Sequence, residues 1–328
     1  MTLRESVLLA LKEENGNWFS GEALSVTLRV SRTMIWKQIK QLRTEGYIVE
    51  ASSRKGYRLV ACPDILSAEE VLPGLKTEVF GRKDYFYYQE IDSTNQQARI
   101  LASQGYPEGT VVVADAQTAG RGRRGRDWYS PAGQGIYMSL ILRPHMPLKE
   151  ISRISLMPAV ALAETLQEEL DLPAQIKWPN DILINKKKIA GILSEAITDM
   201  DGIEFVVIGM GLNINNAESD FPDDFRNHPT SVLAEKKQNA SRIKILQCLL
   251  AKLEQHYQRL QAGDFTEILM AGRRLSMVIG QQVSLETNQG LVTGRAVEID
   301  ENGFLLVKDG SGTLHTVISG EIEVKSDK

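Results

Sequence analysis

The stretch Gln117-Thr118-Ala119-Gly120-Arg121-Gly122-Arg123-Arg124-Gly125-Arg126-Asp127-Trp128 combines four arginines with three glycines. Each glycine costs the interior of a helix or strand up to about 1 kcal/mol, and the arginines have no apolar surface with which to join a core. Guanidinium groups form bidentate contacts with phosphates and carboxylates, and glycines let a backbone bend closely around a ligand. We therefore expect this stretch, the basic loop, to close over a polyanionic small molecule. A solvated basic loop without a ligand is the alternative.

The basic loop also contains the spacing Gly120-x-Gly122-x-x-Gly125, which matches the dinucleotide-binding fingerprint. That motif needs a strand before it, a helix after it and an acidic residue about 20 positions further on. A strand is expected at 111–114, but Trp128-Tyr129-Ser130-Pro131-Ala132-Gly133 follows the loop instead of a helix. No acidic residue ends a second strand at the required distance. These features disfavour a Rossmann fold.

The composition predicts a globular cytoplasmic protein of two or three domains. The chain has 328 residues, of which 42% are hydrophobic and 24% charged. It contains no apolar run long enough to span a bilayer and no signal peptide at its amino terminus. The two cysteines, Cys62 and Cys248, are far apart, and the four histidines are scattered. This pattern favours a reducing compartment and predicts neither a metal site nor a histidine-based triad.

The first sixty residues form a basic segment of an acidic chain. Residues 1–60 hold ten Lys or Arg against six Asp or Glu, a net charge of +4, which leaves −8 for the remainder. Apolar residues at helical spacing predict three short helices, of which Ser20 caps the second and Ser31 the third. Two short strands, at 47–50 and 56–59, follow as a hairpin. This order of elements is typical of a winged helix-turn-helix.

The third helix of this segment has a basic outer face, because Ile35, Ile39 and Leu42 face inward. Such a helix can enter the major groove, and the tip of the hairpin can reach phosphates. Arg29 stands in the preceding turn where glycine is common, and a left-handed arginine is possible there at a cost. A helical module that docks another protein is the alternative. The DNA-binding candidates are Arg32, Thr33, Trp36, Lys37, Lys40, Arg54 and Lys55.

The central part of the chain alternates between strands and helices, and several polar groups stand at their ends. Ser93, Thr94 and Asn95 precede a helix, where they can cap it or bind a polar ligand. Pro179 interrupts a strand at 175–184, which places Lys177, Asn180 and Asp181 at a break in the backbone. Three lysines, Lys186, Lys187 and Lys188, follow in a turn, where such residues are usually solvated, although one that opens a central strand can point inward. The strand at 205–214 contains glycines that indicate a close approach. The expected strands are 84–88, 111–114, 135–142, 189–195 and 205–214, with a long helix at 155–170.

Three motifs, the basic loop, Lys177-Trp178-Pro179-Asn180-Asp181 and Lys188-Ile189-Ala190-Gly191-Ile192-Leu193, together resemble the biotin protein ligases. The amino-terminal winged helix is similar to that of the bifunctional class, whose members also repress the biotin operon. The resemblance covers essentially the whole chain. It implies a ligase that makes biotinoyl-5′-AMP and pyrophosphate from biotin and Mg-ATP. The biotin then passes to one lysine of a biotin carboxyl carrier domain, as in acetyl-CoA carboxylase and other biotin enzymes.

The resemblance also implies roles for single residues. Lys188 would contact the carboxylate and the phosphate, and Arg121 and Arg123 would lie on the loop that closes over the adenylate. Asp181 is the candidate for helping to deprotonate the incoming lysine amine, since only a neutral amine attacks. These four residues, Arg121, Arg123, Asp181 and Lys188, are the catalytic candidates. The substrate-binding candidates are Ser93, Thr94, Asn95, Gln117, Gly120, Arg121, Gly122, Arg123, Trp128, Asn180, Lys188 and Gly191.

The last third of the chain predicts two helices, at 242–260 and 265–275, and then short strands at 282–285, 294–299, 304–307 and 314–318. The resulting fold class is α+β and multi-domain: a winged helix-turn-helix, a central mixed α/β sheet domain of the biotin/lipoate ligase type, and a small SH3-like β-barrel. The expected domain limits are 1–62 for DNA binding, 63–275 for ligation and 276–328 for the barrel.

The resemblance implies a transcriptional switch in addition to the enzyme. Biotinoyl-AMP would favour a homodimer that presents two winged helices to a two-fold operator. ATP with Mg²⁺ and biotin are expected as substrates, with no tightly bound prosthetic group and no membrane partner. Two alternatives remain: a biotin-sensing repressor without catalysis, and a ligase for lipoate or octanoate. The intact Arg121, Arg123, Asp181 and Lys188 disfavour the first, and the basic loop with the winged helix disfavours the second.

Overall fold

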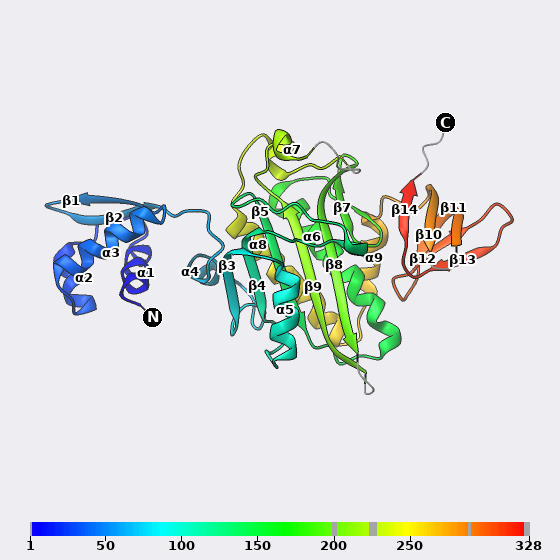
Figure 1. Cartoon of the computed structure of the whole chain (residues 1–328), viewed down its shortest axis with the longest axis horizontal. Coiled ribbons are helices and arrows are strands. Elements are labelled where there is room, and N and C mark those ends of the chain that lie inside the picture. The colour runs from blue at the N-terminus through cyan, green and yellow to red at the C-terminus, as the bar shows by residue number, and fades with distance from the viewer. Residues whose placement is uncertain (1, 199–201, 223–227, 288–289, 325–328) are drawn as a thin grey trace. The chain divides into compact units, whose positions relative to one another are not determined.

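The structure is a computed structural model that describes residues 2–198, 202–222, 228–287 and 290–324. The chain divides into two compact units, residues 1–65 and 66–328 (Figure 1). No helix among these described residues is both long and apolar enough to cross a membrane.

The amino-terminal unit consists of three helices and a hairpin, as the sequence predicts. Ser20 Oγ accepts a hydrogen bond from Ala23 N at 2.9 Å, and Ser31 Oγ accepts one from Met34 N at 3.3 Å, so both expected caps form. Arg29 ends the second helix with φ 55°, so this turn uses the left-handed arginine that the sequence allows at a cost. The elements are α1 (Leu3–Glu13), α2 (Gly21–Leu28), α3 (Arg32–Thr44), β1 (Ile48–Ser52) and β2 (Gly56–Ala61).

One strand contact in this unit was not predicted from the sequence. Phe19 and Tyr57 exchange two backbone hydrogen bonds of 2.8 Å, so the segment before α2 pairs with the hairpin. A single bridging residue has no period and therefore gives no sequence signal. The contact ties the hairpin to the helices, whose shared core is formed by Val7, Leu8, Leu11, Leu24, Ile35, Ile39 and Leu42.

The second unit is built on a seven-stranded mixed sheet with the strand order β3-β4-β5-β9-β8-β7-β6. The pair β3 and β4 is parallel, and all other neighbours are antiparallel. This confirms the central mixed sheet expected from the sequence. The strands are β3 (Tyr85–Ile91), β4 (Val111–Gln117), β5 (Gly135–Leu142), β6 (Gln175–Lys177), β7 (Asp181–Ile184), β8 (Lys187–Thr198) and β9 (Ile203–Asn213).

Helices cover both faces of this sheet (Figure 1). On one face α5 buries Ala98 and Leu101 against Val112, Ile141 and Val207. On the other face the helices α6, α8 and α9 share the main core with the alternate residues of the same strands. The helices of this unit are α4 (Ala68–Val71), α5 (Thr94–Ser103), α6 (Ile151–Leu170), α7 (Val232–Lys236), α8 (Arg242–Gln261) and α9 (Thr266–Leu275).

The last fifty residues form a five-stranded antiparallel sheet with the order β13-β12-β11-β10-β14. The hydrogen-bonded order of the described residues ends at β13 and β14, so an SH3-like barrel stays a prediction. The sequence predicts four of these strands but misses the last one. The strands are β10 (Gln282–Thr287), β11 (Gly290–Ile299), β12 (Leu305–Lys308), β13 (Leu314–Val317) and β14 (Glu321–Val324).

This carboxy-terminal sheet packs against the central domain through directed hydrogen bonds. The buried Trp178 donates from Nε1 to the carbonyl oxygen of Gly303 at 3.0 Å. Ser152 Oγ donates to the carbonyl oxygen of Asn302 at 2.6 Å, and Met277 N donates to the carbonyl oxygen of Ile176 at 3.0 Å. Because Trp178 belongs to the broken strand at 175–184, the sheet is fixed beside the residues proposed for chemistry.

Candidate active site and DNA-binding surface

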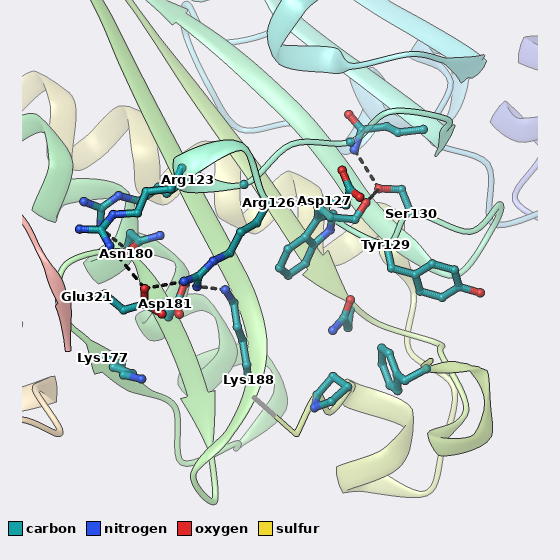
Figure 2. Close-up of a pocket in the computed structure, with 18 of the residues that line it drawn as sticks. Arg123, Arg126, Asp127, Tyr129, Ser130, Lys177, Asn180, Asp181, Lys188 and Glu321 are labelled. Atoms are coloured by element: carbon teal, nitrogen blue, oxygen red, sulfur yellow. Dashed lines mark hydrogen bonds and ion pairs between the residues drawn. The ribbon is translucent and has the colours of Figure 1, made fainter. Parts of the chain in front are cut away.

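A cavity of about 680 Å³ lies between the basic loop, the break between β6 and β7, and the start of β14. Its walls contain Lys177, Asn180, Asp181 and Lys188 on one side and the loop with Trp128 on the other. Figure 2 shows side chains of the loop, of the segment 177–188 and of β14 (Glu321) converging on the cavity, although these segments are far apart in the sequence. A cavity of this size, with a few convergent polar groups, is typical of a small-molecule site.

Lys188 and Asp181 form an ion pair in this cavity. Lys188 Nζ lies 2.7 Å from Asp181 Oδ1 (Figure 2). It also lies 5.3 Å from the centroid of the Trp128 ring. In the β7–β8 pairing Asp181 is opposite Gly191, while Lys188 is opposite Leu183, because the register shifts between Ile182 and Leu183. Since side chains alternate along a strand, this shift brings Lys188 to the same face as Asp181. The inward lysine expected from the sequence is therefore placed by a β-bulge.

The basic loop folds back on itself and directs Arg123 into the site. Trp128 N donates to the Gly120 carbonyl at 2.9 Å, and Gly122 N donates to the Arg126 carbonyl at 2.7 Å. Arg123 Nη1 donates to Asn180 Oδ1 at 2.9 Å. Burial lowers the pKa of the Arg123 guanidinium, while the nearby Asp181 carboxylate acts in the opposite direction. The loop therefore places the partly desolvated guanidinium of Arg123 next to the interruption between β6 and β7.

A hydrogen-bonded polar floor lies under the loop, in a smaller cavity that adjoins the first. Gln117 Oε1 accepts from Thr94 N at 2.9 Å, and Gln117 Nε2 donates to Ser130 Oγ at 2.9 Å. Ser139 Oγ lies 2.9 Å from Thr94 Oγ1 and 2.6 Å from Asn95 Oδ1. These side chains are fixed by one another, so they can present donors and acceptors to a ligand in defined directions.

Two glycines of β9 make room for the side chains of the site. A Cβ at Gly209 would meet Asn95 Oδ1 at 1.9 Å, and a Cβ at Gly211 would meet Trp128 Cε2 at 2.3 Å. Real Cβ atoms essentially never show contacts this short. The close approach expected at the glycines of this strand is therefore confirmed, and its partners are Asn95 and Trp128.

All the residues predicted for substrate binding or catalysis line one of these two adjoining cavities. Sequence reasoning missed several others that contact them. Ser139 is the one serine in the mostly apolar strand β5, which is a signal that could have found it. Glu195 Oε2 accepts from Asn95 Nδ2 at 2.9 Å, and Glu321 reaches the cavity from a strand that was not predicted. The lining residues among the predicted ones are Ser93, Thr94, Asn95, Gln117, Gly120, Arg121, Gly122, Arg123, Trp128, Asn180, Asp181, Lys188 and Gly191.

The DNA-binding candidates lie on one helix and one turn of the amino-terminal unit. Trp36 is 53% exposed, and Lys40 Nζ lies 5.7 Å from the centroid of its ring. Arg32 Nη2 pairs with the exposed Glu22 at 2.8 Å. Thr33, Lys37, Arg54 and Lys55 are also exposed. The surface is accessible and basic, as a surface for DNA phosphates must be.

The hairpin of this unit is braced by an aromatic residue that was not among the candidates. Lys55 Nζ lies 5.7 Å from the centroid of the Trp18 ring, and Arg58 Cζ lies 5.0 Å from it. Cations over an aromatic face are attracted to it, by about 0.5–1 kcal/mol at exposed sites. Trp18 therefore packs against Lys55 of the turn and Arg58 of β2, while Arg54 in the same turn stays exposed.

Residues 86–213 match the Biotin/lipoate A/B protein ligase family, residues 4–58 match an HTH domain, and residues 278–325 match the Biotin protein ligase C terminal domain. The chain is 40% identical over 323 residues to the bifunctional ligase/repressor BirA of Bacillus subtilis (strain 168), covering 98% of this chain and 99% of that relative. It is 41% identical over 324 residues to the BirA of Bacillus spizizenii, again covering 98% and 99% of the two chains.

The structure is similar to that of the biotin protein ligase from Aquifex aeolicus in complex with biotin and ATP. The TM-score is 0.64 at 28% identity, and the match covers 74% of this chain and 99% of that chain. The resemblance drawn from the three motifs is thus confirmed, including its extension to the winged helix. The chain belongs to the family of bifunctional biotin ligase/repressors.

Proposed function

We propose that this protein activates biotin with ATP to biotinoyl-5′-AMP and transfers the biotin to a lysine of a biotin carboxyl carrier domain. The observation that carries the proposal is the position of Lys188 and Arg123, two cations that line one cavity beside the hydrogen-bonded polar floor. Activation must bring two anions together, the biotin carboxylate and the α-phosphate. Fixed cations stabilise that approach and the charge that develops in the transition state.

In the first step, a carboxylate oxygen of biotin attacks the α-phosphorus of ATP. The bond between the α-phosphorus and its bridging oxygen breaks, and pyrophosphate leaves; Mg²⁺ enters with ATP as part of that substrate. We assign Lys188 to the carboxylate and α-phosphate, and Arg121 and Arg123 to closure over the adenylate. Gly120, Gly122 and Gly191 let the backbone approach the ligand.

The polar floor supplies the groups for the ureido ring of biotin. We assign this contact to Ser93, Thr94, Asn95 and Gln117, which already form hydrogen bonds among themselves or with their neighbours. Trp128 has a buried indole N–H without a hydrogen-bond acceptor among the described residues. A buried donor of this kind is costly unless it is paired, so an acceptor on the bound ligand would satisfy it.

In the second step, the ε-amine of the acceptor lysine attacks the acyl carbon. The C–N bond forms, the bond from the acyl carbon to the AMP oxygen breaks, and the amine loses a proton. We propose Asp181 as the group that helps to remove this proton and Asn180 as its neighbour at the acyl phosphate. The Asp181→Asn variant should transfer biotin from preformed adenylate more slowly by about 10²-fold, the lower end for general-base catalysis. Undiminished transfer would remove Asp181 from this role.

The same protein is proposed to repress transcription in the cytoplasm. Biotinoyl-AMP would favour a homodimer, and the paired winged helices would bind a two-fold operator through α3 and the hairpin tip. When acceptor domains consume the adenylate, repression would relax. This assigns DNA binding to residues 1–62, ligation to 63–275 and a supporting role to 276–328.

The experiment that tests the enzyme is mass spectrometry of an acceptor biotin carboxyl carrier domain after incubation with the protein, biotin, ATP and Mg²⁺. One biotinoyl group on one lysine is the expected result. The same incubation with lipoate or octanoate should leave the acceptor unchanged. A verified acceptor that gains no mass with biotin would move the assignment to a non-catalytic biotin sensor or to another acyl substrate.

A further inference from the structure

The four arginines of the basic loop do not share one direction. Arg123 points to Asn180 inside the cavity, whereas Arg124 and Arg126 contact the carboxy-terminal sheet. Arg126 Nη2 donates to Glu321 Oε2, and Arg124 Nη1 lies 3.5 Å from the same oxygen (Figure 2 shows Arg126 and Glu321). Arg121 has no charged partner among the described residues of the chain. Two of the four cations are thus engaged by another domain.

The acidic residues that receive these arginines are a cross-strand pair. Glu321 of β14 is directly opposite Glu286 of β10. Like charges in this position repel each other and destabilise a sheet. Arg124 offsets that repulsion, because its Nη1 lies 3.9 Å from Glu286 Oε2 and its Nη2 donates to the Glu286 carbonyl at 3.4 Å. The loop and the acidic pair therefore stabilise each other.

The electrostatics of the contact agree with its geometry. The hydrogen bond from Arg126 lowers the pKa of the Glu321 carboxyl, and both Arg126 and Arg124 add to this by their charge. The four side chains are all more than one-third exposed, from 39% for Glu321 to 76% for Glu286. Exposed ion pairs are individually weak and are screened by salt. The contact can therefore shift the equilibrium of the basic loop toward its closed position, but it does not prevent the loop from opening.

We propose that Glu321, with Glu286 beside it, is a positioning residue that anchors the basic loop through Arg124 and Arg126 and so keeps Arg123 at the cavity. The arginines thereby divide into an anchoring pair, Arg124 and Arg126, and a ligand-facing pair, Arg121 and Arg123. The anchor opposes opening of the loop and therefore slows the release of whatever the loop covers. The inference rests on the proposed function, because its measured ligand is biotinoyl-AMP.

The test compares the dissociation rate of bound biotinoyl-AMP in Glu321→Gln, Arg126→Gln and the double variant. Labelled adenylate is formed on the full-length protein and chased with excess unlabelled adenylate. Each single variant should release it about two- to fivefold faster, as expected for loss of exposed ion pairs. The double variant should be no faster than Glu321→Gln alone, because the change at residue 321 already removes the carboxylate that Arg126 contacts. Unchanged release in Glu321→Gln would overturn the inference.

A salt series separates anchoring from a general structural role. Release from the unaltered protein should accelerate between low and high NaCl, and release from Glu321→Gln should accelerate less, because one of its salt-sensitive contacts is already absent. Glu323→Gln is the matched control, because Glu323 is on the same strand but pairs with no arginine of the loop among the described residues. It should behave as the unaltered protein. Additive effects of Arg126→Gln and Glu321→Gln would also overturn the inference, since Arg126 would then act on the ligand by itself.

A variant that does not fold and a protein that forms no adenylate can each be distinguished from failure of the anchor. If Glu321→Gln does not fold, the exchanged variant Arg126→Glu with Glu321→Arg is used instead. Slow release in the exchanged variant supports the anchor, and fast release overturns it. If the unaltered protein forms no adenylate at all, the proposed function fails. If it forms adenylate that every variant releases at the same rate, only the anchor fails.

Discussion

In the amino-terminal unit Trp36, Lys37 and Lys40 project from a regular helix into solvent, whereas in the second unit Arg123 and Lys188 are drawn into a cavity by an irregular loop and a β-bulge. The first arrangement suits a long polyanion that approaches from outside, because its cations stay hydrated until phosphates replace the water. The second suits a small ligand, because partial desolvation strengthens each charge interaction. The comparison predicts that the two surfaces can be disabled one at a time.

The largest effect is expected at Lys188, because we assign its cation to both the carboxylate and the α-phosphate. The Lys188→Ala variant should form adenylate about 10³-fold more slowly, a loss comparable with removing one donor from a preorganised anion site. Single-turnover formation of labelled adenylate measures it. Lys187→Ala is the matched control, since Lys187 Nζ pairs instead with Glu218 at 3.3 Å. Normal adenylate formation by Lys188→Ala would contradict the role of Lys188. Binding of DNA by this variant in the absence of ligand should not change.

The reciprocal change disables the exposed surface and spares the cavity. A double variant, Lys37→Ala with Lys40→Ala, should bind DNA about 10- to 100-fold more weakly at low salt, and the slope of log K against log[salt] should fall by about two. The probe is a duplex selected from a random library by the unaltered protein loaded with biotin and ATP. Biotin transfer should be unaffected. An equal loss in Lys12→Ala, on α1, would mean that the effect is one of net charge rather than of the α3 surface.

The exposed surface was also the more predictable of the two. Ile35, Ile39 and Leu42 recur at helical spacing, so the inner face of α3 was visible in the sequence, and the outer face followed by exclusion. The long strands and helices of the second unit were predicted for the same reason. β14 was missed, because Glu321-Ile322-Glu323-Val324 is too short for its alternation to stand out from a loop.

The cavity could not be derived from periodicity, because its parts come from separate segments. Glu321 is 195 residues from Arg126, and no local pattern connects them. The bulge that turns Lys188 toward Asp181 depends on how β7 and β8 pair, which a single strand does not reveal. The resemblance of three motifs named the residues around the cavity, but not the polar neighbours Ser139 and Glu195. Those neighbours depend on tertiary packing.

A smaller effect is expected from the glycine that seats Trp128. In Gly211→Ala the new Cβ would stand 2.3 Å from Trp128 Cε2, so the indole must move or the strand must shift. Overpacking of this kind typically costs about 1–3 kcal/mol of unfolding free energy. Thermal unfolding and the KM for biotin measure the two consequences, and we expect a lower Tm and a higher KM. Gly310→Ala is the control, because a Cβ there meets nothing within 4 Å. Equal Tm and KM values in the two variants would show that the Trp128 indole can move away from the new methyl group without cost.

The smallest predicted effect tests whether the cations of the exposed surface are free for DNA. Arg32 is paired with Glu22 at 2.8 Å, and both side chains are mostly exposed, at 67% and 77%. A phosphate that recruits Arg32 must displace this carboxylate, which also repels the phosphate. The Glu22→Gln variant should therefore bind DNA about two- to threefold more tightly, in keeping with the small free energy of an exposed ion pair.

Fluorescence anisotropy with the selected duplex has the precision to measure a change of this size. Glu13→Gln removes the same charge at the end of α1 and serves as the control for net charge. A gain in affinity confined to Glu22→Gln would show that Glu22 competes with DNA phosphates for Arg32. An equal gain in affinity in both variants would show that the effect comes only from the net charge of the amino-terminal unit. Weaker binding in Glu22→Gln would mean that Glu22 orients Arg32 for DNA. A cation of the exposed surface would then be held in place by a neighbouring side chain before the ligand binds, as Arg123 is in the cavity.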